Sequence, residues 1–204
     1  MNERKNATYK DQDILIADDP SGRVRYGPGL RLVNCQVEVR TDAGAIGLSR
    51  VEMANCTVTA KRPVEKINFT GVRFDKCRFV GEFVNCDFGH QTDPFDYGGA
   101  LIECDFTAAQ LDQCRFFDSK LRAQKMRSAW PQVVLAGNFQ AEAKARLPSA
   151  NTIEEKVFFG VLADAEAEQS ASLRWGPKLA QRMNMSEEQL LAFLDTLPFV
   201  YRGN

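Results

Sequence analysis

The stretch Cys104–Ala123 reads CDFTA AQLDQ CRFFD SKLRA when it is divided into blocks of five residues. The first residue of each block is small, and the third is large and apolar: Phe106, Leu111, Phe116 and Leu121. A helix would spread residues at this spacing around its circumference, and a strand would place them on alternating faces. A period of five instead fits a coil with a square cross-section, in which each block forms one side and points one large and one small residue inward.

The same phase extends towards the N-terminus. Ile67–Gly81 reads INFTG VRFDK CRFVG, and shorter matches surround Cys35 and Cys56. Cys35, Cys56 and Cys77 are 21 residues apart, which is close to one coil of four blocks. An internal repeat with two nested periods is typical of a solenoid. We therefore predict a mainly β protein whose coils stack through backbone hydrogen bonds.

The motif, a small residue followed by Asp or Asn, then Leu or Phe and two further residues, resembles that of the pentapeptide-repeat family. The match extends over Ile67–Phe79 and Cys104–Ala123 and is partial over Leu30–Val58. This resemblance implies a right-handed quadrilateral β-helix, that is, a β-solenoid of pentapeptide-like coils. It implies little about function, because one scaffold supports many roles.

Turn residues and the end of the repeat indicate three segments. We predict an N-terminal cap over residues 1–28, the solenoid over residues 29–125, and a C-terminal strand and helical unit over residues 126–204. Within the cap, Asp13–Ala17 and Arg23–Tyr26 are expected to form a short hairpin that covers the first coil. The C-terminal unit is expected either to cover the other end of the solenoid or to contact a partner or a second copy.

Capping residues and apolar spacing predict the C-terminal elements. Trp130–Leu135 is expected to be a last strand, and helices are expected over Phe139–Leu147, Thr152–Glu168, Leu173–Met183 and from Ser186 to about Leu197. In the second helix, one face is expected to be buried; it consists of Ile153, Val157, Phe158, Val161 and Leu162.

Composition excludes several classes of protein. The 26 basic and 27 acidic residues nearly cancel, whereas a general nucleic-acid binder should be basic. No apolar run is long enough to span a bilayer, and the first residues, MNERKNATYKDQ, contain no apolar core of a signal peptide. We therefore expect a cytoplasmic protein that binds neither membrane nor nucleic acid directly.

The six cysteines contain no C-x-x-C pair, and the chain has one histidine. All six precede a Val or Phe by two residues, at the small inward position of the repeat, so they are expected to be buried, reduced thiols. No nucleotide-binding or nucleophile motif is present, and Asp93 with Asp96 has no further catalytic partner. We therefore expect no enzymatic activity, no metal and no cofactor.

One interruption of the repeat indicates a binding surface. Gly89–Ala100 reads GHQTDPFDYGGA and must leave the solenoid surface, because the inward positions are already filled. Exposed aromatic and charged residues on a loop favour protein contacts. The predicted contact residues are His90, Asp93, Phe95, Asp96 and Tyr97, with Glu103 and Asp105 as supporting charges. The alternative is an ordinary turn in which Phe95 packs on the core.

Charge is unevenly distributed around this loop. Phe79–Cys114 contains no Lys or Arg but seven acids: Glu82, Asp87, Asp93, Asp96, Glu103, Asp105 and Asp112. Basic residues follow at once, from Arg115 to Arg127. An acidic face of this kind would speed association with a basic partner.

The layout resembles that of bacterial toxin-immunity proteins, which implies a non-catalytic scaffold that occludes the active site of a cognate protein toxin. A first alternative is a DNA-mimicking, topoisomerase-protecting pentapeptide protein, although residues 29–125 contain 13 acidic and 13 basic residues. A second alternative is a structural or assembly module, which would form a homodimer through its C-terminal helices.

Overall fold

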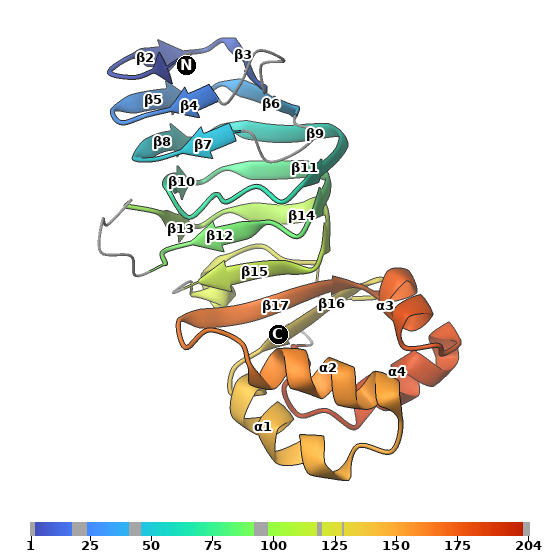
Figure 1. Ribbon diagram of the computed structural model, residues 1–204. Helices are drawn as coiled ribbons and strands as arrows, with labels where there is room; N and C mark the ends of the chain where they lie inside the picture. The colour runs from blue at the N-terminus through green and yellow to red at the C-terminus, as the bar shows by residue number, and fades with distance from the viewer. Residues whose placement is uncertain are drawn as a thin grey trace.

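The computed structural model describes residues 3–17, 24–40, 46–91, 98–117, 120–127 and 129–201. Layers of short parallel strands follow one another along a single axis and end at a group of helices (Figure 1). We call residues 3–117 the parallel stack and residues 129–201 the C-terminal unit. The prediction of a mainly β protein with helices near its C-terminus is confirmed.

In the parallel stack, strands from successive repeats lie side by side. The first sheet contains β1 (Glu3–Arg4), β4 (Val24–Tyr26) and β7 (Ile46–Leu48). The second contains β2 (Thr8–Lys10), β5 (Leu30–Val33), β8 (Val51–Ala54), β10 (Val72–Asp75) and β13 (Ala100–Ile102). The third contains β3 (Asp13–Ala17), β6 (Gln36–Arg40), β9 (Thr57–Glu65), β11 (Arg78–Val84) and β14 (Asp105–Asp112). Leu30, Val51 and Val72 are aligned across neighbouring strands, so the spacing of 21 residues in the sequence is the register of β5, β8 and β10 in the second sheet.

Residues in the left-handed conformation mark the bends between strands. Asn34, Asn55, Lys76 and Glu103 have φ values of 55°, 53°, 52° and 49°, and each lies between a strand of the second sheet and one of the third. Every one of the six cysteines directly follows such a residue. Asn tolerates this conformation well, which explains its recurrence before cysteine in the early repeats.

Large apolar side chains fill the interior, as the period of five predicts. Phe69, Phe74, Phe79, Phe88 and Phe106 are fully buried. Rings of successive layers stack, with centroids 5.0 Å apart for Phe69 and Phe88 and 4.3 Å apart for Phe79 and Phe106. These rings form a continuous aromatic core in the layers from Phe69 to Phe116, whereas the earlier layers are filled mainly by Val, Leu and Ile.

The cysteines are free and buried, as predicted. Each thiol lies within hydrogen-bonding distance of two backbone carbonyl groups, one two residues earlier and one in the preceding layer. For Cys77 these are the carbonyl groups of Asp75 at 3.6 Å and Met53 at 3.3 Å. A cysteine therefore fills the small inward position and also offers a weak donor to carbonyl groups at the bend.

Two buried glutamine side chains close the C-terminal end of the stack. The Gln124 amide accepts from the Cys104 N–H at 2.7 Å and donates to the Leu101 carbonyl at 3.1 Å. The Gln132 amide accepts from the Leu111 N–H at 3.1 Å and donates to the carbonyl of the same residue at 2.9 Å. Each amide has a donor and an acceptor like a peptide group, so it satisfies backbone groups at the edges of β13 and β14.

At the N-terminal end, the expected hairpin is not formed. β3 pairs in parallel with β6, whereas β4 pairs in parallel with β1 and β7. The two segments therefore belong to different sheets of the stack. The physical reason is that each of these segments gains a parallel neighbour from the next layer, which a hairpin would not provide.

The fourth sheet joins the stack to the C-terminal unit. It contains β12 (Asp87–Gly89), β15 (Cys114–Phe117), β17 (Gln169–Trp175) and β16 (Gln132–Ala136), in that spatial order. β17 is antiparallel to both of its neighbours. The predicted helix over Leu173–Met183 is therefore wrong in its first turn, because Leu173 and its neighbours pair with β15 and β16. The expected strand over Trp130–Leu135 is confirmed as β16.

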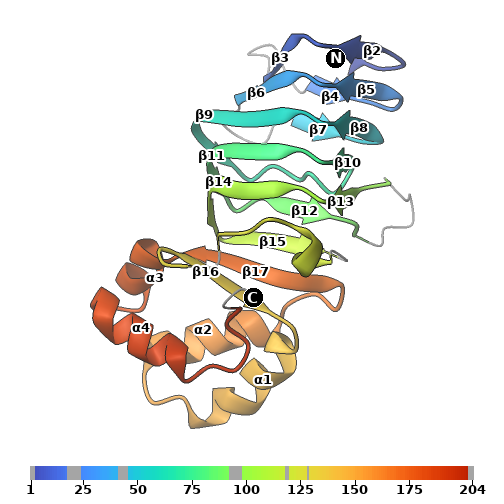
Figure 2. The same cartoon turned by 180° about the vertical axis from the view of Figure 1, so that it is seen from behind.

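The helices, at the bottom of Figure 1 and seen from behind in Figure 2, pack around a second core. They are α1 (Phe139–Arg146), α2 (Ile153–Ala163), α3 (Gly176–Arg182) and α4 (Glu187–Asp195), with a 3-10 turn over Leu147–Ser149. Another 3-10 turn, Leu121–Ala123, lies against the core of the stack. The last block of the repeat thus forms a 3-10 turn at Leu121 rather than a strand. Ser186, the expected start of the last helix, is the N-cap of α4, and its side chain forms a capping box with that of Gln189.

The apolar face predicted for α2 is only partly buried. Phe158, Phe159 and Leu162 pack in the core, whereas Ile153, Val157 and Val161 are 76%, 60% and 58% exposed. The buried face centres on Phe158 and Leu162, because α2 packs through these residues against α1 and the ring of Phe193. The other apolar residues therefore form an exposed stripe at intervals of four.

Candidate binding surfaces

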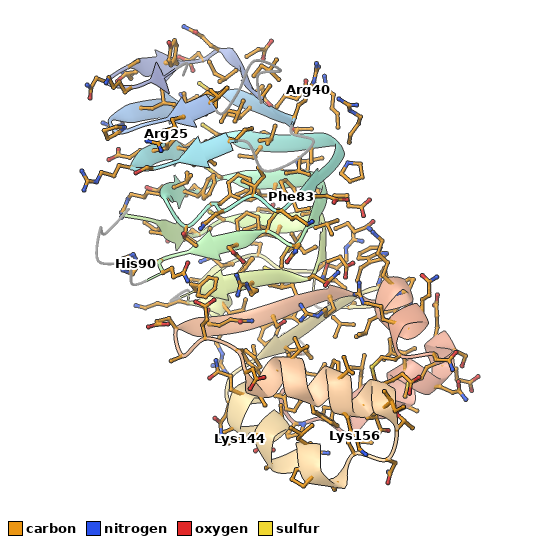
Figure 3. The ribbon with its side chains drawn as sticks, viewed as in Figure 1. Arg25, Arg40, Phe83, His90, Lys144 and Lys156 are labelled. Carbon is orange, nitrogen blue, oxygen red and sulfur yellow. The ribbon has the colours of Figure 1, made fainter. Side chains whose placement is uncertain are left out.

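The described residues include three of the seven predicted contact residues. Asp93, Phe95, Asp96 and Tyr97 lie outside the described residues. His90 directly follows β12 and is half-buried, and its backbone N–H donates to the Phe117 carbonyl at 3.1 Å (Figure 3). Residues 92–97 precede the first residue of β13, whereas Glu103 and Asp105 follow its last residue. The length of β13 therefore separates Glu103 and Asp105 from the segment that begins at His90.

Glu103 and Asp105 both have local structural roles. Glu103 has the left-handed conformation of a bend, and its carboxylate lies 4.0 Å from the Lys76 ammonium in an exposed pair of little energetic weight. The Asp105 carboxylate accepts from the N–H and the hydroxyl of Thr107, at 2.9 and 2.6 Å. Burial raises the pKa of Asp105, but these hydrogen bonds and the charges of Lys125 and Arg78 lower it by a larger amount. The net shift of the pKa is therefore downward.

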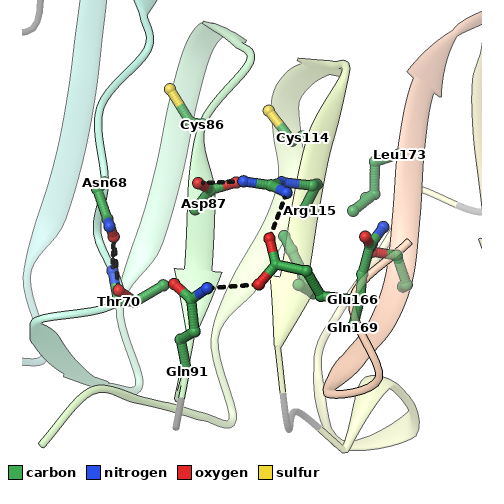
Figure 4. Close-up of polar contacts among 12 residues, drawn as sticks. Asn68, Thr70, Cys86, Asp87, Gln91, Cys114, Arg115, Glu166, Gln169 and Leu173 are labelled. Atoms are coloured by element: carbon green, nitrogen blue, oxygen red, sulfur yellow. Dashed lines mark hydrogen bonds and ion pairs between the residues drawn. The ribbon is translucent and has the colours of Figure 1, made fainter. Parts of the chain in front are cut away.

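An ion-pair network lies beside His90 and links the stack to the C-terminal unit (Figure 4). Arg115 of β15 donates through two nitrogens to Asp87 of β12, at 2.7 and 2.8 Å, and through a third to Glu166 at 2.8 Å. Gln91 donates to the other oxygen of Glu166 at 2.5 Å. The hydrogen bonds that Arg115 donates to Asp87 and the charges of both carboxylates raise the pKa of Arg115 despite its partial burial. Sequence reasoning missed Glu166, which is 51 residues away from Arg115 and belongs to no motif.

A second ion pair lies deeper at the same junction. Asp112, at the end of β14, is almost fully buried and accepts from Arg182 of α3 at 2.7 and 3.1 Å and from the Trp175 N–H at 3.1 Å. Burial raises the pKa of Asp112, but these bonds and the charges of Arg182 and Lys178 bring it below its ordinary value. A neighbouring cation, Arg174, has its pKa lowered to about 10 by burial and by repulsion from Arg182.

These contacts change the interpretation of the acidic block. Glu82 pairs with Lys178 at 2.6 Å, Asp87 with Arg115, and Asp112 with Arg182. The three cations come after the acidic block in the sequence, but the fold places each of them next to an acid of that block. The surface formed by this segment therefore does carry positive charge, supplied by cations from elsewhere in the chain. These cations neutralise the three acids within the protein.

The described residues contain neither a cluster of metal-ligating side chains nor a membrane-spanning helix. Within that part of the chain, no group of three or more His, Cys, Asp or Glu side chains is arranged to hold a metal ion. None of its helices combines the length and the apolar character needed to cross a bilayer. No protein-family model, curated protein or solved structure matches the chain.

Proposed function

We propose that the parallel stack is a right-handed quadrilateral β-helix of pentapeptide-like coils, as the sequence resemblance implies. Three observations support this assignment. Strands β5, β8 and β10 of the second sheet recur at intervals of 21 residues. Residues in the left-handed conformation precede the strands of the third sheet, and the large and small inward positions of the motif are buried.

We also propose that the protein is a non-catalytic binding scaffold, specifically an immunity protein that neutralises a cognate bacterial toxin in the cytoplasm by occluding its active site. The observation that best supports this proposal is the rigid frame on both sides of residues 92–97. Gln91 is hydrogen-bonded to Glu166, which is itself held by Arg115. Gly99 is buried so tightly that an added Cβ would lie 1.8 Å from the Thr70 carbonyl oxygen and 2.5 Å from that of Gly89.

A frame of this kind favours recognition because a segment held at fixed ends loses less conformational entropy on binding. Asp93 and Asp96 would then supply most of the negative charge of the contact, since Glu82, Asp87 and Asp112 are already paired. The same pairing weakens the DNA-mimic alternative, which depends on a large uncompensated acidic surface.

A pull-down from the native cell at low and high salt, read by mass spectrometry, tests the proposal. We expect one stoichiometric partner with a toxic domain whose recovery falls as salt rises. The double substitution Asp93→Lys and Asp96→Lys should then slow association at low salt at least tenfold. The matched control reverses Glu65 and Glu188, which are exposed and distant in sequence.

The outcomes separate the alternatives. Unchanged association of the Asp93 and Asp96 variant would remove residues 92–97 from the contact. Recovery of gyrase subunits would favour topoisomerase protection. Absence of any foreign partner at either salt concentration, with a mass that rises with concentration, would favour a self-associating structural module.

A further inference from the structure

A groove of about 430 Å³ lies where β9, β11 and β14 pass the base of α3. Its floor consists of Ala60, Gly81 and Ala109, which are aligned across the three strands. Trp175, the last residue of β17, lines one end. In Figure 1 this part of the stack lies on the side of α3, away from the ends of β12 and β13 that border residues 92–97. The groove is therefore separate from the surface discussed above.

The central residue of the groove floor, Gly81, cannot be replaced by a residue with a side chain. Gly81 has a φ of +99°, and an added Cβ would lie 2.1 Å from the Ala60 carbonyl oxygen. The register of the strands also changes next to Gly81, where β9 and β11 bend. The bend therefore requires glycine at this position.

Three cations line the groove, and their charges are not fully balanced. The Arg62 side chain has no hydrogen bond or ion pair among the described residues. Within the same part of the chain, Arg127 donates only to a neutral group, the Thr107 carbonyl at 3.1 Å. Lys61 lies 2.6 Å from Glu38, which Arg40 also contacts, so two cations share one carboxylate.

The one carboxylate that lines the groove does not offset this excess. Glu82 accepts from Lys178 of α3 at 2.6 Å, so its charge is already paired. The groove therefore has a local excess of positive charge on a protein whose formal net charge is −1. A local field of this sign attracts anionic groups and discriminates against cationic ones.

We propose that this groove binds a short acidic segment of a partner polypeptide in an extended conformation. Carboxylates of the segment pair with Arg62 and Arg127, and an apolar side chain packs on Trp175. Three strands at ~4.8 Å spacing, together with the flanking Arg127 and Trp175, match an extended chain of about four or five residues at ~3.3 Å each.

A polypeptide fits this groove better than a nucleic acid. Arg62 and Arg127 are two separate cations without an acidic partner among the described residues, which matches a few carboxylates better than a continuous phosphate backbone. One half-buried tryptophan provides a single apolar contact, whereas single-stranded nucleic acids are usually bound on several stacked aromatic rings.

Fluorescence anisotropy with a labelled peptide Glu-Glu-Leu-Glu-Glu tests the proposal on the full chain. We expect saturable binding that weakens at least tenfold in the double variant Arg62→Glu and Arg127→Glu. The matched control, Arg73→Glu with Lys156→Glu, makes the same charge change at two exposed residues outside the groove and should bind as the wild type does. Urea unfolding of both variants verifies that the fold is retained.

Three results would overturn the inference. These are absence of saturable binding to the wild type, equal weakening in both double variants, and tighter binding of a labelled five-nucleotide single-stranded DNA than of the peptide. The peptide Lys-Lys-Leu-Lys-Lys should not bind, and its binding with similar affinity would also exclude a charge-selective groove.

Discussion

The carboxylate of Asp112 and the guanidinium of Arg182 form a two-point ion pair, with N–O distances of 2.7 and 3.1 Å, between the last strand of the third sheet and α3. Only 1% of the Asp112 side chain is exposed, compared with 38% for Arg182. The pair therefore fastens the C-terminal unit to the end of the stack through a charge that has little access to water.

Replacing Arg182 with Ala should lower the free energy of unfolding by about 3 kcal/mol, because the buried carboxylate of Asp112 loses its partner. The combined variant Asp112→Ala and Arg182→Ala should recover part of this loss, since no unpaired charge then remains. Urea unfolding followed by circular dichroism measures both effects. A single variant within about 0.5 kcal/mol of the wild type would show that the pair is not coupled to folding.

The stabilisation that Asp112 gives to the fold should decrease as the pH falls. Its pKa is lowered in the folded protein, so the ionised carboxylate stabilises the fold above the pKa of an unfolded aspartate, about 4. This contribution is lost as the pH falls through the lower pKa of the folded state. The difference in unfolding free energy between the wild type and Asp112→Asn should therefore shrink below about pH 4. A difference that stays constant from neutral pH to about pH 2 would contradict this assignment.

The thiols should be inert while the protein is folded. All six cysteines are buried, and burial raises the pKa of Cys104 to about 11 and that of Cys114 well above its ordinary value. Neither of these two thiols forms much thiolate at neutral pH, so both access and reactivity are low. A hydrogen bond with Cys77 lowers the pKa of Cys56 to about 7, so only burial protects that thiol. An aromatic disulfide reagent should titrate no thiol in native protein and six in urea. Rapid reaction of any thiol in the native protein would show that the stack opens locally.

Two glycines should respond oppositely to substitution by alanine. In Gly99→Ala the new Cβ would lie 1.8 Å from the Thr70 carbonyl oxygen, so we expect a loss of about 2 kcal/mol or more from displacement of the backbone. In Gly160→Ala, within α2, nothing lies within 4 Å, and the better helix former should add about 0.5–1 kcal/mol. Thermal or urea unfolding of the two variants provides the comparison, and equal effects would argue against the close packing at Gly99.

The exposed apolar stripe on α2 is a candidate contact surface for the proposed homodimer and can be tested by substitution. Because Ile153, Val157 and Val161 expose most of their side chains on one face, a second copy could bury them. If it does, light scattering should show a mass that rises with concentration in the wild type and remains that of a monomer in Val157→Lys. The exposed residue Glu168, replaced with Lys, is the control. A concentration-independent mass for the wild type would exclude this homodimer.

The repeat of five residues was sufficient to predict the interior of the stack. Phe106 and Phe116 are buried where the period places them, and Cys77 and Cys104 occupy the small inward positions. These assignments succeed because the inward direction of a side chain depends on the local path of the chain, which each block specifies by itself. The capped start of α4 at Ser186 is predictable for the same reason.

Only the tertiary structure decided how the stack ends and which charges remain free. Gln169–Trp175 is a strand because β15 and β16 supply its hydrogen bonds, and Gln132 closes β14 from a distant part of the chain. Asp112 meets Arg182 across 70 residues. A periodic pattern indicates which side chains face inward. It does not indicate which distant segment covers the edge of a sheet or neutralises a carboxylate. The sequence alone therefore determined the layered core, whereas the closing strand, the ion pairs of the acidic block and the basic groove depended on long-range packing.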